Sequence, residues 1–170
     1  EIFAFASERR ALWTLGVQNA KSFPPGNLAI TDDKGMSFQP VRTIIKPDAK
    51  PILMGDAANR LQSLLIQSIG ERILDAKRVA LAFSGGLDSS VIASFAKKYD
   101  SEIQLIHVGM EGQPEIQQVK GLAEFLDLPL RIKSFTPEDV KKVLPEALWL
   151  IEEPDILKVS VAIPFYWIAE

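Results

Sequence analysis

The sequence contains no cysteine and only one histidine among its 170 residues. The absence of cysteine excludes disulfide bonds, thiolate metal sites and a cysteine nucleophile within these residues. The net charge is −3, without the clustered basic face that marks a nucleic-acid-binding protein. We therefore expect a protein of a reducing compartment, the cytoplasm, with no nucleic-acid partner.

Long hydrophobic runs are also missing. The most apolar stretch, Ile156–Ala169, is interrupted by Lys158, Ser160 and Pro164. It is shorter than the ~20 residues that a helix needs to span a bilayer, so we expect no membrane partner. What the sequence does have is 47% hydrophobic residues, which supports a packed core and argues against disorder.

The N-terminal third differs in character from the rest. Short apolar runs, Ile2–Ala6 and Leu28–Thr31, are separated by serine, glycine and proline, and turn-forming residues occupy positions 32–35. Five prolines fall between Pro24 and Pro51. This composition predicts the edge of a β-rich domain followed by a stiff linker.

From Asp56 onwards, helical and strand patterns alternate. Asp56 has the properties of a helix N-cap, and apolar residues follow it at helical spacing. The expected segments are a helix over 56–73, strands at Val79–Phe83, Ile103–Val108 and Leu130–Lys133, helices at Ser89–Lys98 and 116–126, and a helix from Thr136 to Leu150. The alternation predicts an α/β fold with a doubly wound parallel sheet.

A glycine- and serine-rich segment follows the first strand of this domain. It consists of Ser84, Gly85, Gly86, Leu87, Asp88, Ser89 and Ser90. The glycines let main-chain N–H groups approach an anion, the serines add hydroxyl donors, and the next helix directs its free N–H groups to the same point. This construction suits a pyrophosphate group. It is not a Walker loop, which needs a Gly-Lys-Ser/Thr ending.

The aspartate in this segment sets a further condition. Asp88 would repel a bare phosphate, so we expect Mg²⁺ to bridge its carboxylate to the phosphates. The alternative is a glycine turn that binds no ligand.

The segment Ser84–Ser90 resembles the Ser-Gly-Gly-x-Asp-Ser signature of the N-type ATP pyrophosphatases (the PP-loop superfamily), which includes asparagine, GMP and NAD synthetases. Other segments resemble the glutamine-hydrolysing asparagine synthetases in particular, in the order of that family. They are Phe-Ala-Ser-Glu at 5–8, Ala-Leu at 11–12 and Phe-Pro-Pro-Gly at 23–26, then residues 108–115, 151–155 and 162–166. The residues before position 27 argue against GMP and NAD synthetases.

The resemblance implies a division of the chain. Residues 1–55 would be the C-terminal part of a glutaminase (Ntn-type) domain plus a linker. Residues 56–170 would be the N-terminal part of an ATP-pyrophosphatase synthetase domain of the adenine nucleotide alpha hydrolase type. Because the chain starts at Glu1 without a methionine and stops at Glu170 inside a predicted helix, we expect a piece of a longer protein.

The resemblance also implies a reaction. ATP and Mg²⁺ would bind at Ser84–Ser90, with Asp88 on the metal, and main-chain groups of Ala82, Val108 and Gly109 would hold the adenine. The full-length protein would be an amide-forming ligase that makes asparagine from aspartate and glutamine or ammonia. The aspartate would be activated as an acyl-adenylate, with release of AMP and pyrophosphate. A homodimer is also expected.

The sequence departs from the family pattern in several places. The catalytic cysteine of the glutaminase, a later Ser-Gly-Glu-Gly-x-Asp-Glu segment and a downstream lysine are absent from these residues. No catalytic residue can therefore be assigned, and we expect the fragment alone to be inactive. Leu157–Ser160 stands where bacterial relatives have a Thr-Thr-Ile-Arg stretch linked to substrate handling. This leaves open a β-lactam synthetase-like or other amide-forming relative, and a non-catalytic ATP-binding paralogue.

Two further features have alternative interpretations. We expect His107, in a predicted strand, to be structural or to face solvent rather than to act in catalysis. Glu152, Glu153 and Asp155 form an acidic cluster that could contact a metal or a substrate amino group. The cluster could equally be a solvated helix end.

Overall fold

The computed structural model describes residues 4–45 and 50–170. The start of the apolar run Ile2–Ala6 and the linker residues 46–49 lie outside the described residues. The chain divides into two compact units, Glu1–Pro51 and Ile52–Glu170. No helix among the described residues combines the length and apolarity needed to cross a bilayer.

The first unit contains a short helix and a hairpin. Helix α1 (Arg9–Thr14) precedes the antiparallel strands β1 (Asn27–Asp32) and β2 (Gly35–Pro40). The hairpin turn falls where turn-forming residues predicted it, and Gly35 supplies the φ of +120° that it requires. A hairpin of this size buries little apolar surface, so it needs further partners to be stable.

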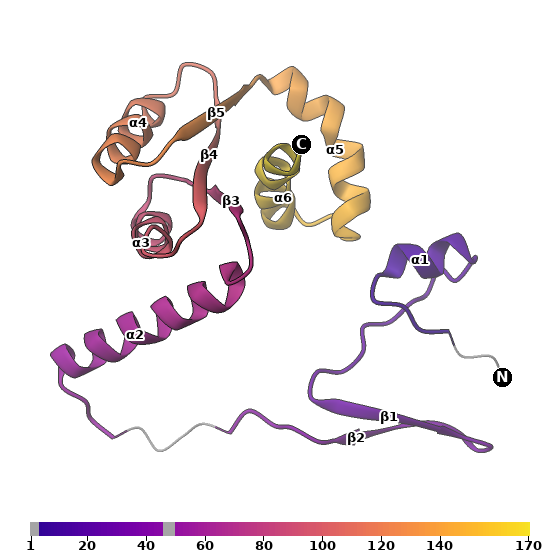
Figure 1. The fold of residues 1–170 in the computed structure, drawn as a ribbon. Coiled ribbons are helices and arrows are strands. Elements are labelled where there is room, and N and C mark those ends of the chain that lie inside the picture. The colour runs from indigo at the N-terminus through magenta and orange to yellow at the C-terminus, as the bar shows by residue number, and fades with distance from the viewer. Residues whose placement is uncertain (1–3, 46–49) are drawn as a thin grey trace. The chain divides into compact units, whose positions relative to one another are not determined.

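The second unit is built on a parallel sheet with the strand order β3-β4-β5. The strands are β3 (Arg78–Ala82), β4 (Glu102–Met110) and β5 (Leu130–Phe135). Helix α2 (Met54–Ile73) precedes the sheet, α3 (Leu87–Ala96) and α4 (Glu115–Leu126) connect its strands, and α5 (Pro137–Ile151) and α6 (Ile156–Ala169) follow it. Figure 1 shows α3 and α4 on one side of the strands and α5 and α6 on the other. The expected α/β fold with a parallel sheet is confirmed.

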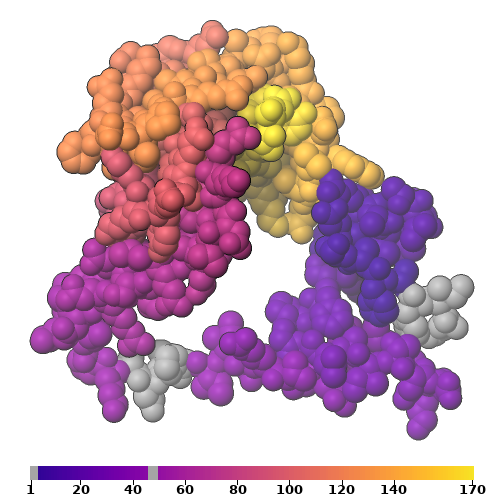
Figure 2. All heavy atoms as spheres, in the orientation of Figure 1, coloured from indigo at the N-terminus to yellow at the C-terminus, as the bar shows by residue number. Residues whose placement is uncertain are grey.

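Each face of the sheet has its own hydrophobic cluster. On the side of α3 and α4, Phe83, Leu105 and Val119 are the largest fully buried side chains. Burying each of them stabilises the fold by roughly 1.5–3 kcal/mol. On the other side, Trp167 of α6 stacks on Phe135 with ring centroids 4.6 Å apart. It forms a buried cluster with Ala147 and Ile163, against which Val108 packs. Figure 2 shows the yellow end of α6 seated against the gold surface of α5.

Two helix starts differ from the expected ones. Helix α2 begins at Met54, with Leu53 at its N-cap, and Asp56 lies inside the first turn. A carboxylate there still interacts favourably with the positive end of the helix dipole. Helix α3 begins at Leu87 rather than Ser89, because Gly86 takes the extended N-cap conformation. Leu87 and Asp88 are therefore helical residues.

Two strands are longer than expected. Strand β4 continues past Val108 to Met110, and β5 continues past Lys133 to Phe135. The reason is that the two strands stay in register, with Gly109 paired to Ser134. The site predicted at the strand ends is therefore bordered by a longer sheet edge than the sequence pattern indicated.

Candidate functional site

The segment Ser84–Ser90, here called the phosphate loop, lies at the carboxyl edge of the sheet between β3 and α3 (Figure 1). The β3–β4 pairing runs to Ala82 and Ile106, and the Phe83 N–H donates to the Ile106 carbonyl at 2.8 Å. The chain then turns into the loop. Ligands of open α/β sheets bind outside the carboxyl ends of the strands, so the fold places this segment where a ligand is expected.

Gly85 is required by the fold itself. Its φ is +76°, a region that side-chain-bearing residues avoid. It is also buried, and a Cβ there would lie 2.7 Å from Val119 Cγ2 of α4. The loop can therefore pass over α4 only because this position has no side chain.

Gly86 is different, because no contact among the described residues requires its missing side chain. Its φ of −79° and ψ of 170° are open to any residue. The nearest atom to a Cβ at this position would be Ser84 Oγ, at 3.4 Å, which is ordinary contact. Gly86 is exposed, so the missing side chain leaves open space directly before the first turn of α3.

Three serine hydroxyls hold the shape of the loop. The hydroxyls of Ser89 and Ser90 donate to the Gly86 carbonyl at 3.1 and 2.9 Å. Ser84 Oγ accepts from the Gly86 N–H at 3.2 Å and lies 3.1 Å from Ser89 Oγ. Because the Ser89 proton points to Gly86, the Ser84 hydroxyl donates in the second contact. All three serines expected in the loop thus converge on Gly86.

The first turn of α3 is open to an anion. Gly86 at the N-cap makes no side-chain capping bond, and the Leu87 side chain points outward, 79% exposed. The first N–H groups of a helix have no intrahelical partner and favour negative charge. The uncapped turn and the space at Gly86 together fit a phosphate group.

Asp88 is an exposed carboxylate in the same turn. No cluster of three or more histidine or carboxylate side chains suited to a metal occurs in the part of the chain that the structure describes. Among the described residues, Asp88 would therefore be the carboxylate that meets a cation at the loop. Mg²⁺ is commonly held in this way, by one or two carboxylates together with substrate phosphates.

The main-chain groups at the strand ends alternate in direction. The Ile106 carbonyl faces β3, and the Leu105 N–H faces the β5 side, where it donates to the Pro129 carbonyl at 2.9 Å. By this alternation, the main-chain groups of Val108 point past the end of β3. Those of Gly109 point to β5, where Gly109 pairs with Ser134.

His107 lies inside the protein rather than in solvent. It is 8% exposed, and its Nδ1 is 2.9 Å from the Phe83 carbonyl oxygen. The structural interpretation is therefore supported and the solvent-facing one is wrong. The alternation along β4, which places His107 on the face of Ile103 and Leu105, could have indicated this burial from the sequence. It could not have indicated the bond to Phe83.

The acidic cluster joins two helices. Glu152 ends α5 with a left-handed φ of 59°, and Asp155 caps α6 by accepting from the Lys158 N–H at 2.9 Å. Glu153 contacts the Lys158 ammonium group. These contacts favour the helix-end interpretation of the cluster over a metal or substrate site.

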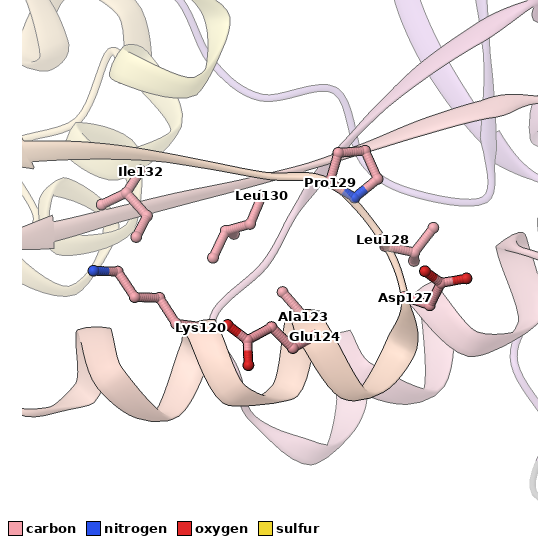
Figure 3. Close-up of a pocket in the computed structure, with 8 residues that line it drawn as sticks. All are labelled: Lys120, Ala123, Glu124, Asp127, Leu128, Pro129, Leu130 and Ile132. Carbon is pink, nitrogen blue, oxygen red and sulfur yellow. The ribbon is translucent and has the colours of Figure 1, made fainter.

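A groove of about 520 Å³ lies between α4 and β5 (Figure 3). Lys120 and Ile132 lie near one end of it and Asp127 near the other. Its lining residues come from α4, from the turn after that helix and from the first half of β5. The groove thus lies toward the amino end of β5, away from the strand ends that border the phosphate loop.

Comparison with known proteins gives consistent results. The family profile described as asparagine synthase matches residues 60–170. A Methanocaldococcus jannaschii protein named as a glutamine-hydrolyzing asparagine synthetase is 30% identical, with 99% of this chain and 34% of that protein aligned. The glutamine-hydrolyzing asparagine synthetase 1 of Bacillus subtilis is 27% identical, with 92% of this chain and 25% of that protein aligned.

Among solved structures, the chain is similar to a glutamine-dependent NAD⁺ synthetase from Acinetobacter baumannii in complex with ADP. The TM-score is 0.47 at 16% identity, over 79% of this chain and 25% of that one. The chain spans about a third or less of the length of the curated relatives it matches. Since the family profile covers well over half of its residues, the chain belongs to the asparagine synthase family.

Proposed function

We propose that the full-length protein is an ATP-dependent ligase that makes asparagine from aspartate, with ammonia released from glutamine. The observation that carries this proposal is the phosphate loop, where Gly86 leaves open a space that the fold does not require. Membership of the asparagine synthase family supports the same reaction. We further propose a cytoplasmic protein with small-molecule partners, and a homodimer.

ATP would bind with its pyrophosphate portion against the phosphate loop. The N–H groups at the start of α3 are the available donors. The hydroxyls of Ser84, Ser89 and Ser90 bond within the loop and would have to leave these bonds to donate to the phosphates. Mg²⁺ would be held by the Asp88 carboxylate together with phosphate oxygens, and it would neutralise negative charge there. The protein then contributes mainly position and electrostatic complementarity.

The adenine would lie beside the ends of β3 and β4. Val108 supports this proposal because its main-chain groups point past the end of β3. The N–H and carbonyl groups of Ala82 point away from β4. The reason is that these groups alternate along a strand, and the N–H of the next residue, Phe83, donates to β4. Gly109 would contribute in another way, because its main chain faces β5. Its role would be to make room for the His107 ring beside the strand end, because a Cβ there would lie 2.8 Å from His107 Nε2.

In the proposed reaction the aspartate side chain attacks the α-phosphate of ATP. The bond between the α- and β-phosphates breaks, giving β-aspartyl-AMP and pyrophosphate. Ammonia then attacks the acyl carbon, and AMP leaves as asparagine forms. Residues 56–170 would supply the first half of the synthetase domain, and residues 1–55 the end of the glutaminase domain with its linker.

The test is pyrophosphate release by the full-length protein in the presence of ATP, Mg²⁺ and aspartate. We expect Asp88→Asn to lower this rate by about a hundredfold or more, because the carboxylate that neighbours the phosphates is lost. Asp100→Asn, which changes an exposed aspartate before β4 at the other end of the sheet, should leave the rate unchanged. Formation of ADP and phosphate instead of AMP and pyrophosphate would contradict the proposal.

The acceptor has a specific alternative. Leu157–Ser160 forms the first turns of α6, and it differs from the stretch that handles substrate in bacterial relatives. A different amino or carboxylic acid could therefore be activated, as in β-lactam-forming enzymes. A panel of carboxylic acids assayed for pyrophosphate release distinguishes the cases. ATP binding without any acceptor-dependent release would favour a non-catalytic paralogue.

A further inference from the structure

His107 is the one buried polar or charged side chain in the described part of the chain. A buried imidazole without a partner would be costly, but this ring has one. Its Nδ1 lies 2.9 Å from the Phe83 carbonyl oxygen. A carbonyl oxygen can only accept, so Nδ1 carries the hydrogen and donates it to Phe83.

This bond fixes the last peptide group before the phosphate loop. The Phe83 N–H is already held by the Ile106 carbonyl at 2.8 Å, and His107 now holds the Phe83 carbonyl. The C=O of Phe83 and the N–H of Ser84 belong to one planar trans peptide and point in opposite directions. The imidazole therefore sets the direction in which the Ser84 N–H enters the loop.

The same ring explains why residue 109 is a glycine. A Cβ at Gly109 would lie 2.8 Å from His107 Nε2, which is too close for ordinary contact. The ring cannot retreat freely, because it is buried and held at Nδ1 by Phe83. The glycine and the histidine therefore form a matched pair on one face of β4.

We propose that His107 is a positioning residue for ATP binding, acting through the Phe83 carbonyl on the entry of the phosphate loop. It does not touch the nucleotide. This inference rests on the proposed function, because it takes the loop to be the ATP site. It adds a requirement outside the loop, namely a hydrogen-bond donor at the δ position of residue 107.

The test is a matched pair of substitutions in the full-length protein. His107→Asn keeps an N–H donor near the position of Nδ1, whereas His107→Leu has a similar shape and no donor. We expect the KM for ATP to rise about three- to tenfold in the leucine variant and to stay within about twofold in the asparagine variant. The KM for the acceptor should not change. Unfolding temperatures identify any loss of global stability.

Equal KM values for ATP in the two variants, with only the unfolding temperature altered, would overturn the proposal and leave a purely structural role. If the leucine variant does not fold, His107→Gln supplies an independent test. Its amide N–H lies one bond farther from the main chain, near the position of Nε2, so it should not replace the Nδ1 donor to Phe83 and the KM for ATP should rise. A KM for ATP equal to that of the asparagine variant would also overturn the proposal.

Failure of the proposed function would give a different result from failure of the inference about His107. If the unsubstituted protein does not bind ATP in a calorimetric titration, the loop is not an ATP site. A difference between the asparagine and leucine variants can arise only when the unsubstituted protein binds.

Discussion

At the scale of single residues, the two glycines of the phosphate loop have different reasons to be glycine. Gly85 has a positive φ and lies against Val119 of α4. Gly86 has neither constraint, and its missing side chain leaves space before the first turn of α3. A substitution at Gly85 should therefore affect folding, whereas a substitution at Gly86 should affect binding.

We predict that Gly85→Ala lowers the free energy of unfolding by about 1–3 kcal/mol, because the new methyl group meets both the backbone strain and Val119. Gly86→Ala should change stability by less than about 1 kcal/mol but weaken ATP binding about tenfold or more. Urea unfolding and calorimetric titration of ATP measure the two effects. Equal stability losses in the two variants would contradict this assignment.

At the scale of elements, α5 starts with a complete capping box. Thr136 Oγ1 accepts from the Asp139 N–H at 3.3 Å, and the Asp139 carboxylate accepts from the Thr136 N–H at 3.0 Å. The Thr136 hydroxyl also donates to that carboxylate at 2.8 Å. These bonds, with Lys142 adding to them, lower the pKa of Asp139 to about 2.

Removing the cap should destabilise the second unit. We predict that Thr136→Val lowers the free energy of unfolding by about 1 kcal/mol, since the hydroxyl is lost with little change in shape. Thr136→Ser keeps the hydroxyl and serves as the control, with most of the stability retained. Urea unfolding at neutral pH measures both variants.

The capping box also predicts a pH dependence. The carboxylate of Asp139 titrates at about 2 in the folded chain and near 3.9 when unfolded. A lowered pKa stabilises the fold above the unfolded value, and this contribution is lost as pH falls from about 4 toward 2. Asp139→Asn should therefore make stability less steep in that range. An unchanged slope in thermal unfolding measured from pH 5 to 2 would contradict the prediction.

The order of the elements could be predicted from the sequence, but their ends could not. Val79–Phe83 and the alternation along β4 have local patterns that indicate buried strands, and the helix opened by Thr136 has a local capping pattern. The start of α3 depends instead on Gly86, whose extended conformation follows from how Gly85 passes α4. No local pattern records a contact with Val119.

The residues of the candidate site could be predicted from the sequence, but the contacts that hold the site in place could not. The residues of the phosphate loop are contiguous, so their composition alone indicated an anion site. The bond from His107 to Phe83 joins two strands, and the packing of Gly109 depends on a side chain two positions away that faces inward. Such contacts become visible only when the strands are placed side by side.

At the scale of the molecule, the chain consists of two compact units, Glu1–Pro51 and Ile52–Glu170. We propose that the first belongs to a glutaminase domain and the second to the synthetase domain. In the first unit, the Gly26 carbonyl accepts from the Val41 and Arg42 N–H groups at 2.9 and 3.0 Å. A Cβ at Gly26 would clash with the Arg42 carbonyl, and its φ is +69°.

We predict that Gly26→Ala in the full-length protein lowers asparagine formation driven by glutamine and leaves that driven by added ammonia unchanged. Gly16→Asn is the control, because no atom of residues 4–45 or 50–170 lies within 4 Å of a Cβ there and asparagine tolerates a positive φ. Amino-acid analysis with each nitrogen source measures the products. An equal loss of asparagine formation with glutamine and with ammonia would argue against assigning the first unit to a glutaminase domain.

The space at Gly86 has a consequence for how this sequence can change over time. Folding holds Gly85 in place whatever the protein does, because its φ and its contact with Val119 admit no side chain. Folding places no such demand on Gly86. In a lineage that had stopped using a ligand here, random substitution would be expected to replace Gly86 while Gly85 persisted. If the loop binds a ligand, as we propose, Gly86 should be kept in relatives that bind it and lost in relatives that do not, whereas Gly85 should be kept in both.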